Sequence, residues 1–581
     1  MTEPFERGQR IDGGFRKTLV VACLASLPFA AAAQTPPPPA APNAGSLLQQ
    51  AQPGIVAPPP SSVGLPEMAA PRAIAAPLSG GPKVTVRAFR LAGIDAAQAA
   101  VLTPLLDKYV GEGKSLNDLE DAAKDIEVAL QRQGTFLAQA YVPEQNLADG
   151  IVTLQVLEGR IGAVKLEVQP GVKVSAEQMQ GVLGRLQGNP VARRDLVESA
   201  LFTLGDLRGV IVTSALTPGA QVGFADLTVT VAPGPAQAFS IDFDNGGSIF
   251  TGRYRFSSNL EFFNLASRGD VFSLKTQFST SFGSGFLRGS WLTPINSLGT
   301  KLGLAASYLR YSLGTPTFEA LDANGTASAL SVQLLHPMIR SRNSNLFLQA
   351  SADRREFQDK VNSIQIVAKK GNSSYFTFGA VGDFRDALAG GGITNYSANV
   401  IGGSLRITSL DDFVLDQGTT GYQSAGRYSK VVLTGSRLQV LPNKDYLYLS
   451  ASGQIASKNL DSSEKFSLGG PLGVRGYPSP ESPSDSGVLA GWEYRKPMKF
   501  DQLKGDFIFA VFGDYGYGRL HENPLATDTG NTRKLMSHGV GVTFDNDRGM
   551  LLKAWVAARG STRAQSDDSR ARGYVQISQQ F

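Results

Sequence analysis

Apolar and polar residues alternate with a period of two through most of the second half of the chain. In "RYRFSSNLEF" (253–262) aromatic residues and leucine fall mainly on even positions, while arginine, asparagine and glutamate fall on odd ones. Similar alternation occurs in "VFSLKTQFS" (271–279), "YLYLSASGQI" (446–455) and "LLKAWVAA" (551–558). Successive side chains of a strand point to opposite faces, so each segment predicts a strand with one apolar face. The pattern runs from residue 238 to 581, and it predicts no helix in that part.

Residues 83–234 have a different pattern. A strand-like segment is followed by two segments with apolar residues at helical spacing and then by two more strands. Ser115 followed by Asp118 predicts the start of one helix, and Gly134 predicts its end. The same order then occurs a second time. The sequence therefore predicts two α+β modules of roughly 75 residues each.

The N-terminal segment predicts export from the cytoplasm. Arg16 and Lys17 precede an apolar run that ends in Ala31, Ala32 and Ala33, which is typical of a signal peptide over residues 1–33. "VVAC" around Cys23 resembles a lipoprotein cleavage box, but very little apolar sequence precedes it, so lipidation is the less favoured alternative.

Residues 34–82 are rich in proline and alanine and predict an extended linker. "AGSLLQQAQ" (44–52) within it predicts two turns of helix. This helix is either a helix-prone stretch of the linker or an element that docks elsewhere.

After residue 33 no run of 18 apolar residues occurs, so strands rather than helices would have to cross a membrane. Alternation alone also fits a soluble sandwich. The signal peptide and the length of the strand region favour an outer-membrane barrel, as does the final strand "GYVQISQQF". Val575, Ile577 and Phe581 share one face of it and resemble the C-terminal signal by which such barrels are recognised for assembly. Residues 238–581 allow about 16 strands at roughly 20 residues per strand and connection.

Composition and motifs argue against several function classes. The net charge is +5 with 18% charged residues, which is no footprint of nucleic-acid binding. The motif G-x-S-x-G is absent, and "GEGKS" (111–115) lacks the first glycine of a phosphate loop because that position is Lys108. His336, His521 and His538 lack metal-ligand spacing. We therefore predict no catalytic residue, no metal and no cofactor.

Five motifs in order resemble one family. They are "YVPEQNLADGIVTLQVLEGRI" (141–161), residues 193–231, "TGRYRFSSNLEFFN" (251–264), "GGPLGVRGYP" (469–478) and "FGDYGYG" (512–518). The chain resembles the two-partner secretion transporters of ShlB/FhaC/HecB type, relatives of the BamA-like assembly factors. The resemblance implies two periplasmic POTRA domains, here residues 83–161 and 162–234, followed by an outer-membrane barrel over 238–581. It also implies an N-terminal helix that enters the barrel.

The glycine-rich hairpin is the candidate site. In the family it folds into the barrel lumen, so Val474, Arg475, Gly476 and Tyr477 are predicted to form a latch. The strand motif supplies the wall residues Asp514, Phe512 and Gly516. Independently, Asp514 has the parity opposite to that of Phe507, Phe509 and Val511, which suit lipid, and so points inward. An inward carboxylate needs a partner, and Arg475 offers a bidentate one. The alternative is an exposed loop with an incidental arginine.

The resemblance implies export of a partner polypeptide. POTRA domains of the family receive an unfolded client, and an open sheet edge explains how, because it offers unpaired backbone groups to any extended chain. The expected partners are a secreted TpsA-like haemolysin, adhesin or toxin, the lipids of the outer membrane and the barrel-assembly machinery. A BamA-like insertase is the main alternative. A passive porin or adhesin is a third class, which has no need of two periplasmic modules.

Overall fold

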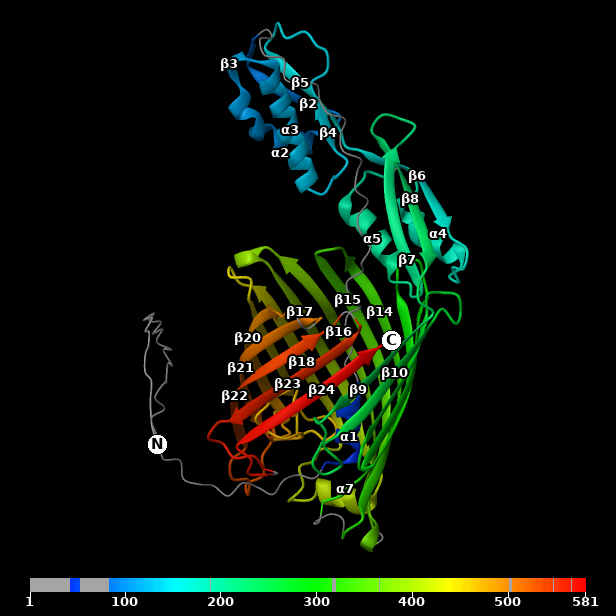
Figure 1. Ribbon diagram of the computed structural model, residues 1–581, viewed down its shortest axis with the longest axis vertical. Helices are drawn as coiled ribbons and strands as arrows, with labels where there is room; N and C mark the ends of the chain where they lie inside the picture. Colours follow the sequence, from blue (N-terminus) through cyan, green and yellow to red (C-terminus); the bar gives the residue numbers. More distant parts are fainter. Residues whose placement is uncertain are drawn as a thin grey trace, which may run out of the picture. The chain divides into compact units, whose positions relative to one another are not determined.

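The computed structural model describes residues 42–52, 83–188, 190–315, 320–364, 366–500, 504–546, 548–565 and 567–581 (Figure 1). The predicted signal peptide and most of the predicted linker lie outside the described residues.

Among the described residues, sixteen antiparallel strands close into a barrel, which confirms the predicted fold class. The strands follow the chain order, and the last one pairs with the first. They are β9 (Gln237–Asp244), β10 (Arg255–Phe263), β11 (Val271–Ser279), β12 (Ser284–Pro294), β13 (Lys301–Ser312), β14 (Ala323–Arg340), β15 (Ser344–Val361), β16 (Ile366–Asp386), β17 (Gly392–Ile407), β18 (Gly426–Val440), β19 (Tyr446–Ala456), β20 (Ser486–Lys499), β21 (Asp506–Arg519), β22 (Thr532–Asp545), β23 (Met550–Arg559) and β24 (Ala571–Gln580). We call the end at which β9 begins the proximal end and the opposite end the distal end.

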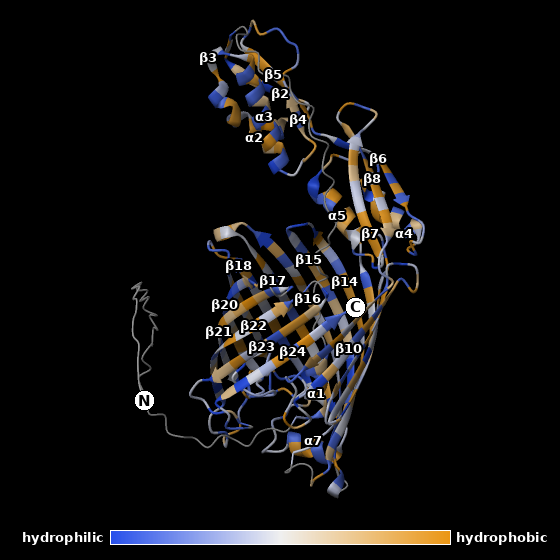
Figure 2. Ribbon diagram, viewed as in Figure 1, coloured by the Kyte–Doolittle hydropathy of each residue, from blue (hydrophilic) through white to orange (hydrophobic). Residues whose placement is uncertain are grey.

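The alternation of the sequence sets which side chains face outward. On β21, Phe509 and Val511 are 40% and 50% exposed, whereas Phe512 and Asp514 are 1% and 8% exposed. The same alternation of apolar and polar residues is visible along the strands in Figure 2. A closed barrel pairs every strand, so it satisfies the backbone groups without water.

The barrel closes between β24 and β9, and this seam is short. Five residue pairs join the two strands, from Gln576 with Asp244 to Gln580 with Ser240. The ring of Phe581 stacks on that of Phe239 with centroids 5.7 Å apart, just beyond the last pair. Val575 and Ile577 face outward at 40% and 39% exposure.

The first α+β module packs two helices against small sheets. Its core holds residues from both helices and from the central strand, including Ile126, Leu130 and Leu154. The elements are β1 (Val84–Val86), β2 (Ala88–Ala92), α2 (Ala96–Leu102), the 3-10 helix η1 (Thr103–Tyr109), β3 (Gly111–Lys114), α3 (Leu116–Arg132), β4 (Gln139–Tyr141) and β5 (Ile151–Leu157). The strand order is β2-β5-β4, and β1 pairs with β3. Ser115 and Asp118 form the predicted capping box.

The second module has the order predicted from the sequence. Its elements are β6 (Arg160–Val168), α4 (Ala176–Leu183), the 3-10 helix η2 (Gly184–Leu186), α5 (Arg194–Gly205), β7 (Val210–Pro218) and β8 (Phe224–Pro233). The sheet has the order β6-β8-β7, and β6 runs parallel to β8. Both outer strands, β6 and β7, pair along their length only with β8 among the described residues.

Two short helices belong to the barrel half of the structure. Helix α1 (Ala44–Ala51) lies inside the barrel, where Ala44 and Leu48 are fully buried in a cluster with inward residues of β12 to β15 and of β17 (Figure 1). Helix α7 (Leu410–Gln417) lies in the distal loop between β17 and β18. The prediction of no helix after residue 238 was therefore wrong. Strand periodicity breaks for only eight residues there, which is too short to stand out.

No helix among the described residues is long and apolar enough to cross a membrane.

Candidate functional site: the lumenal hairpin

The segment between β19 and β20 leaves the distal end and folds back inside the barrel. It includes the hairpin over residues 466–484, whose ends pair through Phe466 and Ser484. The buried residues of this hairpin pack with Leu535 of β22 and Ala564 of the loop before β24. The structure therefore places the glycine-rich motif against the inner wall rather than in an exposed loop.

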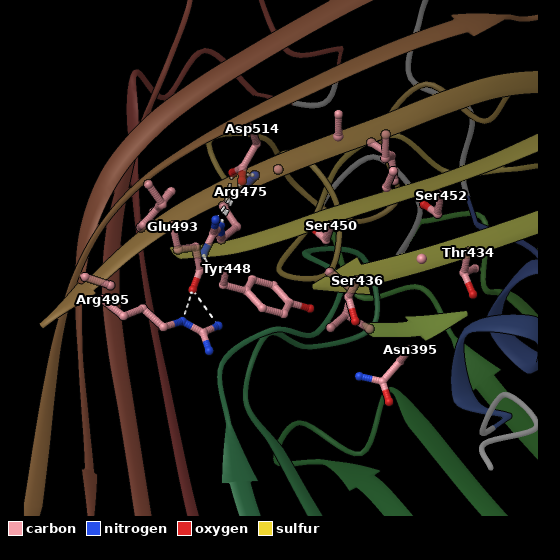
Figure 3. Close-up of a pocket in the computed structure, with 18 of the residues that line it drawn as sticks. Asn395, Thr434, Ser436, Tyr448, Ser450, Ser452, Arg475, Glu493, Arg495 and Asp514 are labelled. Atoms are coloured by element: carbon pink, nitrogen blue, oxygen red, sulfur yellow. Dashed lines mark hydrogen bonds and ion pairs between the residues drawn. The ribbon is translucent and has the colours of Figure 1, made fainter. Parts of the chain in front are cut away.

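Arg475 is held by two carboxylates from neighbouring strands (Figure 3). Its Nη2 donates to Asp514 Oδ1 at 2.7 Å, and its Nη1 donates to Glu493 Oε1 at 2.6 Å. Its Nε and backbone N–H also donate to Asp514, both at 3.0 Å from Oδ2. Asp514 lies on β21 and Glu493 on β20, so one side chain ties the hairpin to two strands.

The wall completes this site with further contacts. The Arg475 guanidinium lies 3.5 Å from the centroid of the Phe512 ring. Ser537 on β22 donates to Asp514 Oδ2 at 2.8 Å, and Arg495 donates to Glu493 Oε2 at 2.7 Å. Each side-chain nitrogen of Arg475 and each carboxylate oxygen of Asp514 and Glu493 therefore has a partner, as a mostly buried ionic network requires.

The glycines of the hairpin serve close packing more than unusual dihedrals. Of the four glycines in "GGPLGVRG", only Gly470 has a positive φ, at +106°. A Cβ on Gly476 would lie 2.8 Å from backbone atoms of Arg559, so the hairpin backbone touches the wall there. A Cβ on Gly516 would lie 2.9 Å from Val474 Cγ2. Glycine therefore allows close approach at two separate contacts, that of Gly476 with β23 and that of Gly516 with Val474.

Val474 and Tyr477 anchor the hairpin on either side of the arginine. Both are fully buried. The Tyr477 hydroxyl donates to the carbonyl of Thr562 at 2.9 Å, and Tyr574 of β24 donates to the Tyr477 carbonyl at 3.1 Å. The hairpin is therefore bonded to β20, β21 and β24 and to the loop before β24.

A cavity of about 1040 Å³ lies in the lumen beside the hairpin. Arg475, Glu493 and Asp514 line it together with polar residues of the nearby strands β17 and β19, such as Asn395 and Ser450 (Figure 3). Leu472, at the tip of the hairpin, also lines it and is 99% exposed.

A second set of site residues was not predicted from the sequence, and it holds helix α1. Asp359 of β15 accepts from the N–H of Ala44 at 2.8 Å and from the Tyr311 hydroxyl at 2.7 Å. Arg355 Nη2 donates to Gln52 at 3.0 Å, and its Nη1 donates to Glu464 at 3.2 Å. These side chains face inward by strand parity, but parity alone could not show which distant segment they meet.

The distal loops are joined to one another. Asn459 donates to the carbonyls of Tyr422 and Asn523, both at 2.8 Å. The rings of Tyr422 and His521 stack with centroids 3.7 Å apart. Burial and nearby Lys465 lower the pKa of His521 to about 4, with Asp528 opposing them. Three loops thus meet at the distal end through aromatic and amide contacts, and Tyr422 also donates to Asp528 at 2.9 Å.

No group of three or more histidine, cysteine, aspartate or glutamate residues with metal-binding geometry occurs in the described part of the chain.

Comparison with known proteins identifies the family. The model of the haemolysin secretion/activation protein ShlB/FhaC/HecB matches residues 223–544, and the model of the ShlB-type POTRA domain matches residues 84–159. The heme/hemopexin transporter protein HuxB of Haemophilus influenzae (strain 86-028NP) is 28% identical over 464 residues, which cover 78% of this chain and 80% of HuxB. The outer membrane transporter CdiB of Dickeya dadantii (strain 3937) is 21% identical over 473 residues, 80% of each chain.

The fold has a counterpart among solved structures. CdiB from Escherichia coli superimposes with a TM-score of 0.69 at 18% identity, covering 89% of this chain and 93% of that one. The predicted family, outer-membrane location and periplasmic POTRA domains are confirmed, so the proximal end of the barrel is periplasmic. Since the family model spans more than half of its residues, the chain belongs to the ShlB/FhaC/HecB family of outer-membrane two-partner secretion transporters.

Proposed function

We propose that this transporter exports one partner polypeptide, which its POTRA domains bind unfolded and its barrel passes to the cell surface. The observation that carries the proposal is the Arg475 hairpin, fixed beside a lumenal cavity of about 1040 Å³. The cavity lies inside a barrel that has periplasmic domains, so it supplies part of the path that we propose for the client.

The sheet edges of the POTRA domains suit an extended client. Strands β2 and β7 each pair along one side with a strand of their own sheet in the described residues. On the open face of β7, Ile211 is 54% exposed beside the exposed residues Thr213 and Ala215. Backbone hydrogen bonds to such an edge recognise any extended chain, and side chains add selectivity.

Segments of the chain itself lie in the proposed path. Helix α1 and the hairpin both occupy the lumen, and the loops at the distal end are joined. Export therefore requires that some of these contacts break. The inward residues Lys275 and Lys553 contribute to a hydrated wall along which a polar backbone can pass.

Energy for export has to come from the client. The periplasm contains no ATP, and the sequence has no nucleotide-binding motif. Folding of the client outside the cell makes its passage one-way. We propose no catalytic activity for this chain.

We infer the partner class from the family. HuxB is named a heme/hemopexin transporter. A large exported protein that binds haem or hemopexin is thus the first candidate, beside a haemolysin, an adhesin or a toxin. Outer-membrane lipids and the barrel-assembly machinery are proposed as further partners, because a barrel needs both to reach its place.

The test is secretion of a candidate partner, ideally one encoded beside the transporter. The partner is expressed with the wild-type transporter, with a variant lacking residues 83–234, and without the transporter. Amounts of the transporter and of unrelated barrels in the outer membrane are measured in the same cells.

If the partner leaves the cell only with the intact transporter, and the truncated barrel reaches the membrane without exporting it, the proposal stands. If secretion is unchanged while unrelated outer-membrane proteins decrease, the chain is an insertase instead.

A further inference from the structure

The outer face of strands β13 to β18 carries exposed cations near the distal end. The chain enters the barrel from the periplasmic POTRA domains, so β9 begins at the periplasmic end and the distal ends are extracellular. The cations lie in the extracellular parts of five of these six strands. They are Arg310, Arg354, Lys360, Lys370, Arg406 and Arg427, and all are exposed.

The strand register brings these cations together. Arg354 lies opposite Ser374, which lies opposite Ser404, which in turn lies opposite Arg427. Lys370 and Arg310 lie along a second row through Gln358 and Thr326. Arg406 lies opposite Asn372, between these rows. We call these six residues the basic belt.

The belt differs from the inward cations beside it in having few acidic partners. The inward residues Arg355, Lys369 and Lys430 are paired with Glu464 or Asp461 inside the lumen. Among the described residues, the one ion pair of the belt joins Arg354 to Glu356 at 3.1 Å, and both side chains of that pair are more than half exposed. Unpaired positive charge thus faces outward, where an anion can meet it.

The belt adjoins the apolar surface that faces the membrane. On the same outward face, toward the periplasm, lie large exposed apolar side chains. They are Val332 at 48%, Phe376 at 72%, Phe378 at 62%, Val400 at 57% and Leu433 at 52% exposure, and Leu330, at 63%, lies directly opposite Arg354. Cations at such a border sit at the level of the lipid headgroups.

The belt covers one side of the barrel. Toward the seam, the outward residues in the extracellular parts of β9 to β11 are aromatic, with Phe243, Phe256 and Phe278 among them. Exposed outward cations also occur at the extracellular ends of β21 and β22, where Arg519 is paired with Glu522 and Lys534 stands outside the belt. The belt differs from them because its six cations lie on neighbouring strands, so a single anionic neighbour can meet several of them.

We propose that the basic belt binds the phosphate groups of lipopolysaccharide in the outer leaflet. The apolar strands below hold the acyl chains of the same molecule, and the arginine guanidinium groups match phosphate oxygens in pairs. This interaction goes beyond the export of a partner, and it fixes the lipid beside β13 to β18.

The test uses the purified full-length protein in a neutral detergent. Binding of bisphosphorylated lipid A and of the same lipid without phosphates is measured by native mass spectrometry. The belt variant is Arg406→Gln/Arg427→Gln. The matched control is Lys496→Gln/Lys534→Gln, which removes two exposed outward cations of β20 and β22 outside the belt.

We expect the belt variant to bind bisphosphorylated lipid A about thirty-fold more weakly, the effect of two cations near an anionic surface. The control should bind as the wild type does, and the lipid without phosphates should not distinguish the proteins. Equal binding of both lipids by the wild type overturns the proposal, as does an unchanged affinity of the belt variant.

A second measurement needs no variant. Added salt screens exposed charges, so it should weaken binding of bisphosphorylated lipid A to the wild type. Binding that does not change with salt also overturns the proposal, even if the belt variant fails to fold.

Discussion

Arg475 is the residue on which the hairpin depends most. Replacing it with alanine leaves Asp514 and Glu493, whose side chains are 6% and 15% exposed, without their common cation. Breaking a buried pair from one side costs about 3–5 kcal/mol, and less where water reaches the charges. We expect Arg475→Ala to reach the outer membrane, to unfold at a lower temperature and to lose most export of the partner.

Two further variants serve as controls, one at Arg475 itself and one at its neighbour Arg495. Arg475→Lys keeps the charge but not the planar fork, so export should recover only in part. Arg495→Gln removes the second cation that binds Glu493 but leaves the bond between Arg475 and Asp514. It should therefore reduce export less than Arg475→Ala does. Normal export by Arg475→Ala would show that the latch is not needed for transport.

His521 gives the distal loops a dependence on pH. Its pKa is about 4, and the ordinary histidine pKa is about 6.5, so folding favours the neutral ring. The neutral His521 ring therefore contributes fully to the stability of the loop contacts above about pH 6.5. This contribution is lost as the pH falls toward 4. The largest loss is about 3 kcal/mol, since each pKa unit corresponds to 1.36 kcal/mol.

Hydrogen exchange of residues 520–531 at pH 7 and pH 5 measures this loss, after correction for the intrinsic exchange rates. His521→Phe keeps a ring against Tyr422 but cannot take up a proton, so its protection should not change between the two pH values. Equal behaviour of the wild type and the variant would mean that another group controls the loops.

At the scale of elements, helix α1 closes part of the lumen through very close packing. A Cβ on Gly45 would lie 2.5 Å from Ser463 Cβ, so a larger side chain has no room there. We expect Gly45→Val to displace α1 and to raise the conductance of the barrel in planar lipid bilayers.

Gln50→Ala is the matched control for this helix, because Gln50 is exposed within the lumen and its loss leaves the packing intact. A conductance of Gly45→Val equal to that of the control would show that α1 does not limit the channel.

The sequence predicted the elements better than their contacts. The barrel was predictable because a membrane imposes outward apolar residues on every strand, as on β21. Asp514 was predictable as an inward residue from parity, and Arg475 from the motif around it. Glu493 and Asp359 were not predicted, since parity identifies a face but not the segment that meets it across the lumen. Helix α7 was missed because eight residues carry too few periods.

At the scale of the whole molecule, one buried ion pair joins the second POTRA domain to the barrel. Arg340 of β14 forms a bidentate pair with Asp206, at the C-terminal cap of α5, and the two side chains are 1% and 9% exposed. Asp206→Ala should therefore free the domain from the barrel rim. Spin labels on α5 and on the turn between β14 and β15 should then show a broader distribution of distances.

Asp195→Ala offers the control, since it removes an acid of the same helix whose pair with Arg193 is more than half exposed. An exposed ion pair contributes little to stability, so the distance distribution of Asp195→Ala should match that of the wild type. An unchanged distribution for Asp206→Ala would mean that other contacts hold the domain.

The hairpin inside the barrel also has a consequence for the order of assembly. Tyr477 is bonded to the loop before β24 and to β24 itself, and Gly476 touches Arg559 of β23. The last strands of the chain therefore close around a segment that precedes them in the sequence. Because the closing strands contact the hairpin, we expect its variants also to delay the appearance of the closed barrel. Their effect on biogenesis would then be visible before any partner is exported.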